Sequence, residues 1–281
     1  MCGFIGVVSR DASNRFPEDK LRRMNSLIAH RGPDDEGFYF SDWLSLAFRR
    51  LKIIDLSEKG HQPMFDIAGT HVIVFNGEIY NYKEIRDELI GKGFKFRSDS
   101  DTEVLLNSYL CWGKDCLHKF IGMFAFIIAD LSNRTLFFAR DQLGIKPLFI
   151  CETPENIFFS SEIKALIPAV KLEPDYDSIK EYLVFRSLPG ENTMFKNVCK
   201  LGAGHFGFWR NGVLRTSQYF NLAETLRPNS ELNFESACAI TEDCLSESIR
   251  LHLRSDVELG VQLSGGVDSS LVTALASKIS G

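Results

Sequence analysis

The sequence predicts an α+β domain that is followed by the opening part of an α/β domain. Over roughly the first 205 residues, short runs of aromatic and β-branched residues alternate with two segments of helical periodicity. Near the end of the chain, an apolar run leads through a glycine-containing loop into a helical segment, which is the repeating unit of a parallel sheet. The two patterns indicate two domains, in agreement with a length of 281 residues.

Three apolar runs in the first domain are typical of strands. They cover residues His71–Phe75, Gly122–Ile128 and Thr135–Phe138, and they consist largely of Val, Ile and Phe. Each run is shorter than the roughly ten residues that a helix needs to show its period. We therefore expect all three as strands.

Two segments between these runs have helical spacing. They are Tyr82–Lys92 and Thr102–Trp112, and Ser100–Glu103 provides an N-cap for the second helix. The apolar faces are marked by Ile85, Leu89 and Ile90 in the first helix and by Val104, Leu105, Ser108 and Tyr109 in the second.

The second domain follows a polar stretch that contains Pro228 and Asn229. We expect the first domain at residues 1–220, a linker at 221–233 and the start of the second domain at 234–281. This last part should consist of a helix, a strand, a loop and a second helix, over Phe234–Arg254, Val257–Leu263, Ser264–Ser270 and Leu271–Ile279 respectively. Because a domain takes about 100 residues or more, we expect it to be incomplete in this chain.

Composition excludes several classes of protein. The net charge of −5 and the absence of a Lys/Arg run give no support for a nucleic-acid or membrane surface. No apolar stretch approaches the ~20 residues of a membrane span, and the N-terminus does not resemble a secretory signal. The seven cysteines form no metal-binding pair, so we expect reduced thiols in a cytoplasmic protein and no metal site: Cys2, Cys111, Cys116, Cys151, Cys199, Cys238 and Cys244.

Cys2 is the most informative residue because it directly follows Met1. A side chain as small as that of Cys permits removal of Met1, which leaves a thiol and a free α-amine on one residue. The α-amine titrates near pH ~8 and can accept the proton of the thiol at neutral pH. Cys2 is therefore a candidate nucleophile that carries its own base, although an ordinary residue at the start of a strand is the alternative.

A series of further motifs follows in order along the chain. With these motifs, the whole chain from Cys2 onward resembles the glutamine-dependent asparagine synthetases, and its first part resembles the N-terminal-nucleophile glutaminase domain of class II amidotransferases. The motifs are Met1–Phe4, His30–Asp34, Arg50–Asp55, Asn76–Asn81, Ser98–Glu103, Arg140–Leu148, Ser160–Leu166 and Ser264–Ser270.

The resemblance implies a fold and a reaction for the first domain. The fold is a four-layer αββα sandwich in which two mostly antiparallel sheets stack between helical layers. Cys2 would attack the side-chain amide of glutamine to give a thioester and ammonia, and water would then release glutamate. The Asn76 side chain and the Gly77 N–H would stabilise the oxyanion, although Asn-Gly is also the commonest two-residue hairpin turn.

Glutamine also has to be held by its α-carboxylate and α-ammonium groups. The planar guanidinium of Arg50 suits the carboxylate, and Asp101 and Glu78 suit the ammonium. By resemblance, the glutamine-binding residues are Arg50, Ile53, Ile54, Asn76, Gly77, Glu78 and Asp101. We expect His30–Asp34, Arg140–Asp141 and Lys146–Pro147 to be structural.

The loop at residues 264–270 resembles the pyrophosphate-binding loop of ATP-dependent adenylating enzymes. Small residues let the backbone approach phosphate, and the following helix offers N–H groups. Because no Gly-Lys-Ser/Thr sequence follows, the lysine-containing P-loop is excluded. The expected ATP-binding residues are Leu263, Ser264, Gly265, Gly266, Val267, Asp268, Ser269 and Ser270.

The leading hypothesis is an asparagine synthetase-type amidotransferase that acts on glutamine, aspartate and ATP with Mg²⁺. The glutaminase half needs no cofactor, and the expected assembly is a homodimer without nucleic-acid or membrane partners. A same-family enzyme that acts on another carboxylate, such as a sugar acid or a natural-product precursor, remains the alternative. So does a glutaminase fold that binds without turnover.

Overall fold

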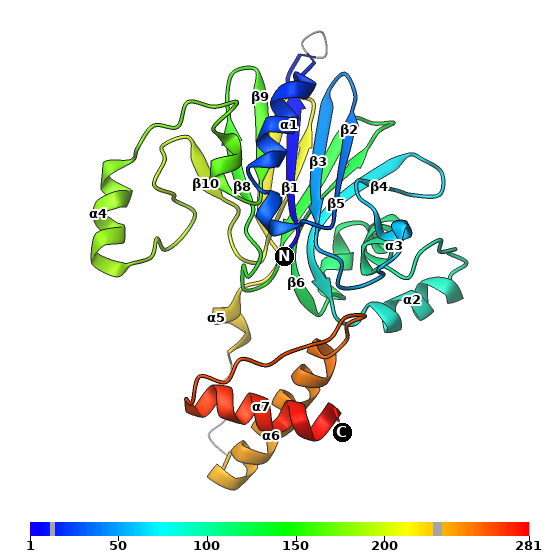
Figure 1. The fold of residues 1–281 in the computed structure, drawn as a ribbon, viewed down its shortest axis with the longest axis vertical. Coiled ribbons are helices and arrows are strands. Elements are labelled where there is room, and N and C mark those ends of the chain that lie inside the picture. Colours follow the sequence, from blue (N-terminus) through cyan, green and yellow to red (C-terminus); the bar gives the residue numbers. More distant parts are fainter. Residues whose placement is uncertain (12–14, 227–231, 281) are drawn as a thin grey trace.

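The structure is a computed structural model that describes residues 1–11, 15–226 and 232–280. Two six-stranded antiparallel sheets lie face to face and are covered on their outer sides by helices (Figure 1). The predicted α+β sandwich of four layers is therefore confirmed.

The first sheet has the strand order β10-β8-β9-β1-β3-β2. Its outer face is covered by helix α1 (Glu18–Ser26), whose Leu21 and Met24 are fully buried. The strands are β1 (Gly3–Ser9), β2 (Asp35–Phe40), β3 (Leu44–Arg50), β8 (Phe149–Glu152), β9 (Asn156–Ser160) and β10 (Val198–Lys200).

The second sheet has the order β12-β11-β7-β6-β5-β4. Its strands are β4 (Met64–Phe65), β5 (His71–Ile79), β6 (Gly122–Asp130), β7 (Thr135–Arg140), β11 (His205–Arg210) and β12 (Val213–Gln218). Strands β5, β6 and β7 contain the three predicted apolar runs, so those predictions are confirmed.

The centre of the sandwich is the apolar layer between the two sheets. Phe4 and Phe48 reach it from the first sheet, and Val74 and Ile127 reach it from the second. All four are fully excluded from solvent. Burial of side chains of this size stabilises the sandwich by about 1.5–3 kcal/mol each, and it makes the strand ends next to this layer a rigid base for functional groups.

Helices α2 (Tyr82–Gly91) and α3 (Asp101–Trp112) cover the outer face of the second sheet. Helix α3 begins as predicted, because the Ser100 hydroxyl accepts the Thr102 N–H. Ile85 and Leu89 of α2 are buried, whereas Ile90 is 52% exposed. The assignment of Ile90 to the apolar face was wrong because its position on the helix turns it toward solvent.

The C-terminal part of the chain lies below the sandwich and consists mainly of two helices, α6 (Phe234–His252) and α7 (Val267–Ser280) (Figure 1). The predicted linker contains one helical turn, α5 (Leu222–Thr225), while Pro228 and Asn229 lie outside the described residues. Helix α4 (Tyr176–Phe185), on an arm beside the first sheet, was not predicted.

The strand predicted at Val257–Leu263 is wrong, because these residues form no strand in the structure. Their apolar side chains are exposed; Leu259, for example, is 50% accessible. A strand of a parallel sheet needs neighbouring strands for its backbone hydrogen bonds. No described strand pairs with this segment, and both six-stranded sheets belong to the sandwich.

Candidate active site around Cys2

Cys2 lies at the entrance to strand β1, beside the end of β3. Its Sγ accepts the Leu51 N–H at 3.3 Å and lies 3.6 Å from the Leu51 carbonyl oxygen, to which the S–H donates. Arg31 fixes the backbone by donating from Nε to the Cys2 carbonyl oxygen at 2.8 Å. A Cβ at the neighbouring Gly3 would meet the Arg31 Cδ at 2.9 Å, so the glycine gives the Arg31 side chain room to approach. The thiol is thus held in one position.

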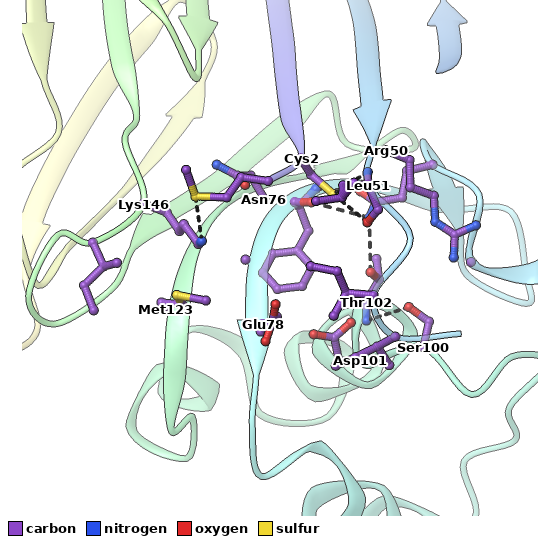
Figure 2. Close-up of a pocket in the computed structure, with 18 residues that line it drawn as sticks. Cys2, Arg50, Leu51, Asn76, Glu78, Ser100, Asp101, Thr102, Met123 and Lys146 are labelled. Atoms are coloured by element: carbon purple, nitrogen blue, oxygen red, sulfur yellow. Dashed lines mark hydrogen bonds between the residues drawn. The ribbon is translucent and has the colours of Figure 1, made fainter. Parts of the chain in front are cut away.

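Cys2 faces a cavity of about 290 Å³ (Figure 2). The structure brings together all seven residues that were predicted to bind glutamine, with Cys2, around this one cavity. The lining consists of Met1, Cys2, Arg50, Leu51, Ile53, Ile54, Gly60, Gln62, Phe75, Asn76, Gly77, Glu78, Ser100, Asp101, Thr102, Met123, Ile145 and Lys146.

The Asn76 amide is buried in this lining without a hydrogen-bond partner. The residue is fully excluded from solvent, and neither Oδ1 nor Nδ2 pairs with any of the described residues. An unpaired buried amide costs about 1–3 kcal/mol, so its retention calls for a ligand group. The amide of Asn76 can supply an N–H donor to such a group.

Gly77 presents a backbone donor at the same place. Phe124, its partner on β6, exchanges hydrogen bonds with Asp141, so the pair of Gly77 and Phe124 is a non-hydrogen-bonded one. The Gly77 N–H therefore points to the opposite edge of β5. On that edge, the N–H groups of Phe75 and Ile79 are taken by the side chains of Gln62 and Asp101. The Gly77 N–H lies between them and faces the cavity.

The suggestion that Asn76-Gly77 forms a turn was wrong. Both residues lie within β5, which pairs with β6 along its whole length from His71 to Ile79. Glycine is needed for a different reason, because a Cβ at Gly77 would overlap the Met123 carbonyl oxygen.

Arg50, at the end of β3, is almost fully buried beside the cavity. Its guanidinium donates to the carbonyl oxygen of Ser57 at 2.8 Å and to that of Asp55. Two of its five N–H donors are thereby used to fix its orientation, and the others remain for a ligand. A Cβ at Gly60 would collide with the guanidinium, which explains the glycine at that position.

Asp101 and Glu78 supply two neighbouring carboxyl groups. Burial raises the pKa of Asp101 to about 7, and the charge of Glu78 adds to this effect, while the hydrogen bond from the Ile79 N–H opposes it. Burial also raises the pKa of Glu78, against the positive charge of Lys146. A bound ammonium group would relieve the repulsion between the two carboxylates.

Lys146 was predicted to be structural, but its ammonium group lines the cavity. The side chain is almost fully buried, and its Nζ lies 3.2 Å from the thioether sulfur of Met1 (Figure 2). Burial lowers the pKa of Lys146, whereas Glu78 raises it. The local sequence carried no signal for this position, because the loop after β7 reaches the cavity only through the fold of the second sheet.

The N-terminal groups are affected by the same surroundings. Burial lowers the pKa of the Met1 amine, and the charges of Arg31 and Lys146 lower it further. Burial raises the pKa of the Cys2 thiol, while the backbone hydrogen bond from Leu51 opposes this. A lowered pKa increases the share of neutral amine at a given pH, and the neutral form is the one that accepts a proton from the thiol.

His30 and Arg31 lie outside the reacting groups, as expected. Both contact Glu162, the former through Nε2 at 2.8 Å and the latter through a guanidinium N–H at 2.9 Å. Because Arg31 also binds the Cys2 carbonyl oxygen, Glu162 orients the residue that holds the nucleophile in place.

The predicted nucleotide loop is far less enclosed than the Cys2 cavity. Leu263 is 59% exposed and Val267 is 85% exposed. Gly265 adopts a positive φ of 83°, and the Ser264 and Ser269 hydroxyls are 2.9 Å apart. Helix α7 begins at Val267 and not at Leu271 as predicted, so the last four residues of the predicted loop form the first turn of the helix. The small residues and the helix start resemble a phosphate-binding turn that lacks covering neighbours.

Within residues 1–11, 15–226 and 232–280, no group of three or more His, Cys, Asp or Glu side chains is placed to hold a metal ion. None of the helices seen there combines the length and the apolar character that crossing a membrane requires. All seven cysteines are free thiols.

Comparisons with known families divide the chain into two parts. A family model described as a glutamine amidotransferase domain matches residues 1–220, and one described as asparagine synthase matches residues 241–281. The chain is 38% identical over 284 aligned residues to the glutamine-hydrolyzing asparagine synthetase 1 of Bacillus subtilis, and it is 33% identical to the "Amidase chry2" of Gibberella zeae. Each alignment covers 99% of this chain but only 44% and 43% of those relatives.

The fold is also similar to a solved structure. The glutamine phosphoribosylpyrophosphate amidotransferase of B. subtilis matches with a TM-score of 0.57 at 14% sequence identity. The match covers 99% of this chain and 64% of that one. At this identity the likeness concerns the fold alone.

Proposed function

Because this chain belongs to the glutamine amidotransferase family, we propose that its Cys2 cavity hydrolyses glutamine to glutamate and ammonia. The single observation that carries the proposal is the unpaired amide of Asn76, buried in the cavity that Cys2 faces. An oxyanion that forms beside a nucleophile is stabilised by a hydrogen-bond donor that has no other partner.

The first half of the reaction forms a thioester. Removal of Met1 leaves the α-amine on Cys2, and this amine takes the thiol proton as Sγ bonds to the side-chain carbonyl carbon of glutamine. The oxyanion receives hydrogen bonds from Asn76 Nδ2 and from the Gly77 N–H. When the C–N bond breaks, the Cys2 ammonium returns the proton to the leaving group, and ammonia departs.

The second half consumes water. The Cys2 amine removes a proton from water, whose oxygen bonds to the thioester carbon and regenerates the oxyanion. Breakage of the C–S bond releases glutamate, and the proton returns to the sulfur. Asn76 and Gly77 act twice, and no group other than Cys2 has to transfer protons.

Substrate selection rests on the charged walls of the cavity. Arg50 would bind the α-carboxylate with the N–H donors that are not committed to the loop carbonyls. Asp101 and Glu78 would bind the α-ammonium, and Ile53 and Ile54 would pack against the methylene groups. An amide without both charged groups would leave buried charges unpaired, so it should be rejected.

For the whole protein, we propose glutamine-dependent asparagine synthesis from aspartate and ATP. The chain spans 44%, 45% and 39% of the length of three relatives from Bacillus subtilis that are named as glutamine-hydrolyzing asparagine synthetases. The residues that would hold the pyrophosphate of ATP with Mg²⁺ are Ser264–Ser270. Bound ATP would supply an adenylate leaving group on the acceptor carboxylate, and ammonia would replace it.

A second candidate acceptor is another carboxylate. One relative, at 33% identity, is named as an amidase and not as an asparagine synthetase. The two candidates share the chemistry of the Cys2 cavity and differ in the residues that would bind the acceptor. An assay of the complete protein with aspartate and with other carboxylates, in which AMP release is measured, distinguishes them.

The organisation follows from the same relationship. We propose a glutaminase domain at residues 1–220, a linker at 221–233 and the start of the ATP-binding domain at 234–281. The first family match ends at residue 220, which supports the first bound, and the second match begins at residue 241, seven residues after the proposed domain start. A cytoplasmic homodimer is the assembly that we propose, to be checked by cell fractionation and by light scattering.

The test is glutamate release from glutamine by purified protein whose mass confirms that Met1 is gone. We expect release that disappears in Cys2→Ala and persists in Cys244→Ala, a matched exposed cysteine of α6. No release from the correctly processed chain would contradict the proposal and would favour a glutaminase fold that only binds.

A further inference from the structure

The segment that follows helix α6 is hydrogen-bonded to the loop that forms one wall of the Cys2 cavity. Asp256 donates its backbone N–H to the Ile53 carbonyl oxygen at 3.0 Å. Its carboxylate accepts the Asp55 N–H at 2.8 Å. Ile53 lines the cavity, so residues of the C-terminal part contact the predicted glutamine site directly.

Arg254 makes a second contact with the opposite side of the site. Its guanidinium donates to the carbonyl oxygen of Tyr80, two residues after Glu78, at 2.7 Å. It also pairs with Glu84 of α2 at 2.6 Å. The two contacts place the start of the C-terminal domain between the loop after β3 and the end of β5.

Asp55 connects the Asp256 contact to the charged groups of the cavity. Its carbonyl oxygen accepts a hydrogen bond from Arg50, and its carboxylate accepts the Asp99 N–H at 3.0 Å. Asp99 lies two residues before Asp101. Asp55 therefore links the residue proposed to bind the substrate carboxylate with the segment proposed to bind the substrate ammonium.

The backbone of Asp55 does not favour this position by itself. Its φ of 55° is in the left-handed region, which is strained for a residue other than glycine. Hydrogen bonds from Ser57 and Asp99 outweigh its burial and lower the pKa of its carboxyl group. These bonds hold the side chain, whereas Asp256 is the acceptor for the backbone N–H.

We propose that Asp256 is a positioning residue for glutamine binding, which holds the loop of residues 51–57 so that Arg50 stays aligned with the cavity. The inference rests on the proposed glutamine hydrolysis and adds to it. The C-terminal domain then sets the affinity of the glutaminase site through Asp256, without contributing an atom to the reaction.

The test compares KM for glutamine and kcat for glutamate release in the 281-residue chain and three variants. Asp256→Ala removes the acceptor for the Asp55 N–H, and we expect KM to rise about three- to tenfold, the loss of one such hydrogen bond, with kcat within about twofold. Asp256→Asn keeps a carbonyl oxygen in the same place, so it should recover most of the affinity. Glu258→Ala removes the same charge from an exposed position two residues further on, and its KM should equal that of the unaltered chain.

The outcomes distinguish the positioning role of Asp256 from the proposed glutamine hydrolysis. An unchanged KM in Asp256→Ala, or an equal rise in Glu258→Ala, contradicts the positioning role while the unaltered chain still turns over glutamine. A parallel fall of kcat, affinity and melting temperature would show a general loss of structure and would also contradict it. If KM rises as much in Asp256→Asn as in Asp256→Ala, the positioning role is likewise contradicted. Absence of glutamate release from the processed, unaltered chain contradicts the proposed function itself.

Discussion

The Cys2 cavity and the Ser264–Ser270 loop carry equally recognisable motifs, but the structure surrounds them very differently. Asn76 is fully buried, and Arg50 and Asp101 are 4% and 5% exposed. In the loop, by contrast, Val267 is 85% exposed. Two sheets and two helices position the residues of the Cys2 cavity, whereas the Ser264–Ser270 loop adjoins a single helix.

A motif therefore becomes a site only when enough of the chain encloses it. In a cavity shielded from water, hydrogen-bond donors and charges interact more strongly and are held in advance of the substrate. An exposed loop gives a ligand few fixed partners. We therefore expect the glutaminase chemistry to be complete in this chain and the nucleotide site to be incomplete.

The largest expected effect is the loss of kcat on removal of the buried amide of Asn76. Asn76→Ala should lower kcat for glutamate release by about 10²–10³-fold, because it removes one oxyanion donor. Asn25→Ala is the control: Asn25 is equally buried, with an unpaired Oδ1 of its own, but it lies at the end of α1. A similar loss of kcat in both variants would mean that general damage, and not the oxyanion contact, causes the effect.

A pair of glycine substitutions compares the packing of the two regions. Gly77→Ala should cost about 1–3 kcal/mol of unfolding free energy, because the new Cβ overlaps the Met123 carbonyl oxygen. Gly260→Ala should change it little, because no atom lies within 4 Å of a Cβ there. Urea unfolding of both variants measures the difference. Equal destabilisation would refute the contrast between a packed domain and an open segment.

The pH dependence of glutamine binding tests the buried charges of the cavity. Burial raises the pKa of Asp101 to about 7, so acidification below this pH neutralises the carboxyl group and removes its attraction for the substrate ammonium. KM should therefore rise as pH falls, by up to about tenfold per pH unit. Asp101→Asn should show a high KM without this dependence. A flat KM profile in the unaltered chain would argue against Asp101 as the ammonium partner.

The smallest expected effect concerns Lys146. Burial and, to a lesser degree, the positive charges of Arg31 and Lys146 lower the pKa of the Met1 amine, and we expect Lys146 to act in the same way on the Cys2 amine that removal of Met1 exposes. Lys146→Met should raise that pKa, so the acidic limb of the kcat/KM profile should move to higher pH. Lys146→Arg keeps the charge and should leave the limb in place. Arg31, Glu78 and the Cys2 thiol also act on the Met1 amine, and they are unchanged in both variants. Identical profiles for all three proteins would exclude an influence of Lys146 on the base.

The features predictable from the sequence were those with local causes. The aromatic strands at His71, Gly122 and Thr135 and the cap at Ser100 follow from residue type and spacing, and the structure confirms them. The charged residues Arg50 and Asp101 were found through their motifs.

The features that were missed depend on distant parts of the chain. Asn76-Gly77 is a strand because β6 pairs with it, and Lys146 is buried because a loop of the second sheet reaches Cys2. Val257–Leu263 has a strand-like sequence but no described strand as a partner. The contact between Asp256 and Asp55 joins residues about 200 positions apart, which no local pattern indicates.

The most direct test of the account is to trap the covalent intermediate. The processed chain should be mixed with glutamine, quenched in acid within the first turnover, and digested for mass spectrometry. We expect a γ-glutamyl group on the peptide that begins with Cys2. It should be absent in Cys2→Ala and still present in Asp268→Ala, which alters only an exposed side chain in the first turn of α7. Release of glutamate without any adduct on Cys2, or an adduct on another cysteine, would contradict it.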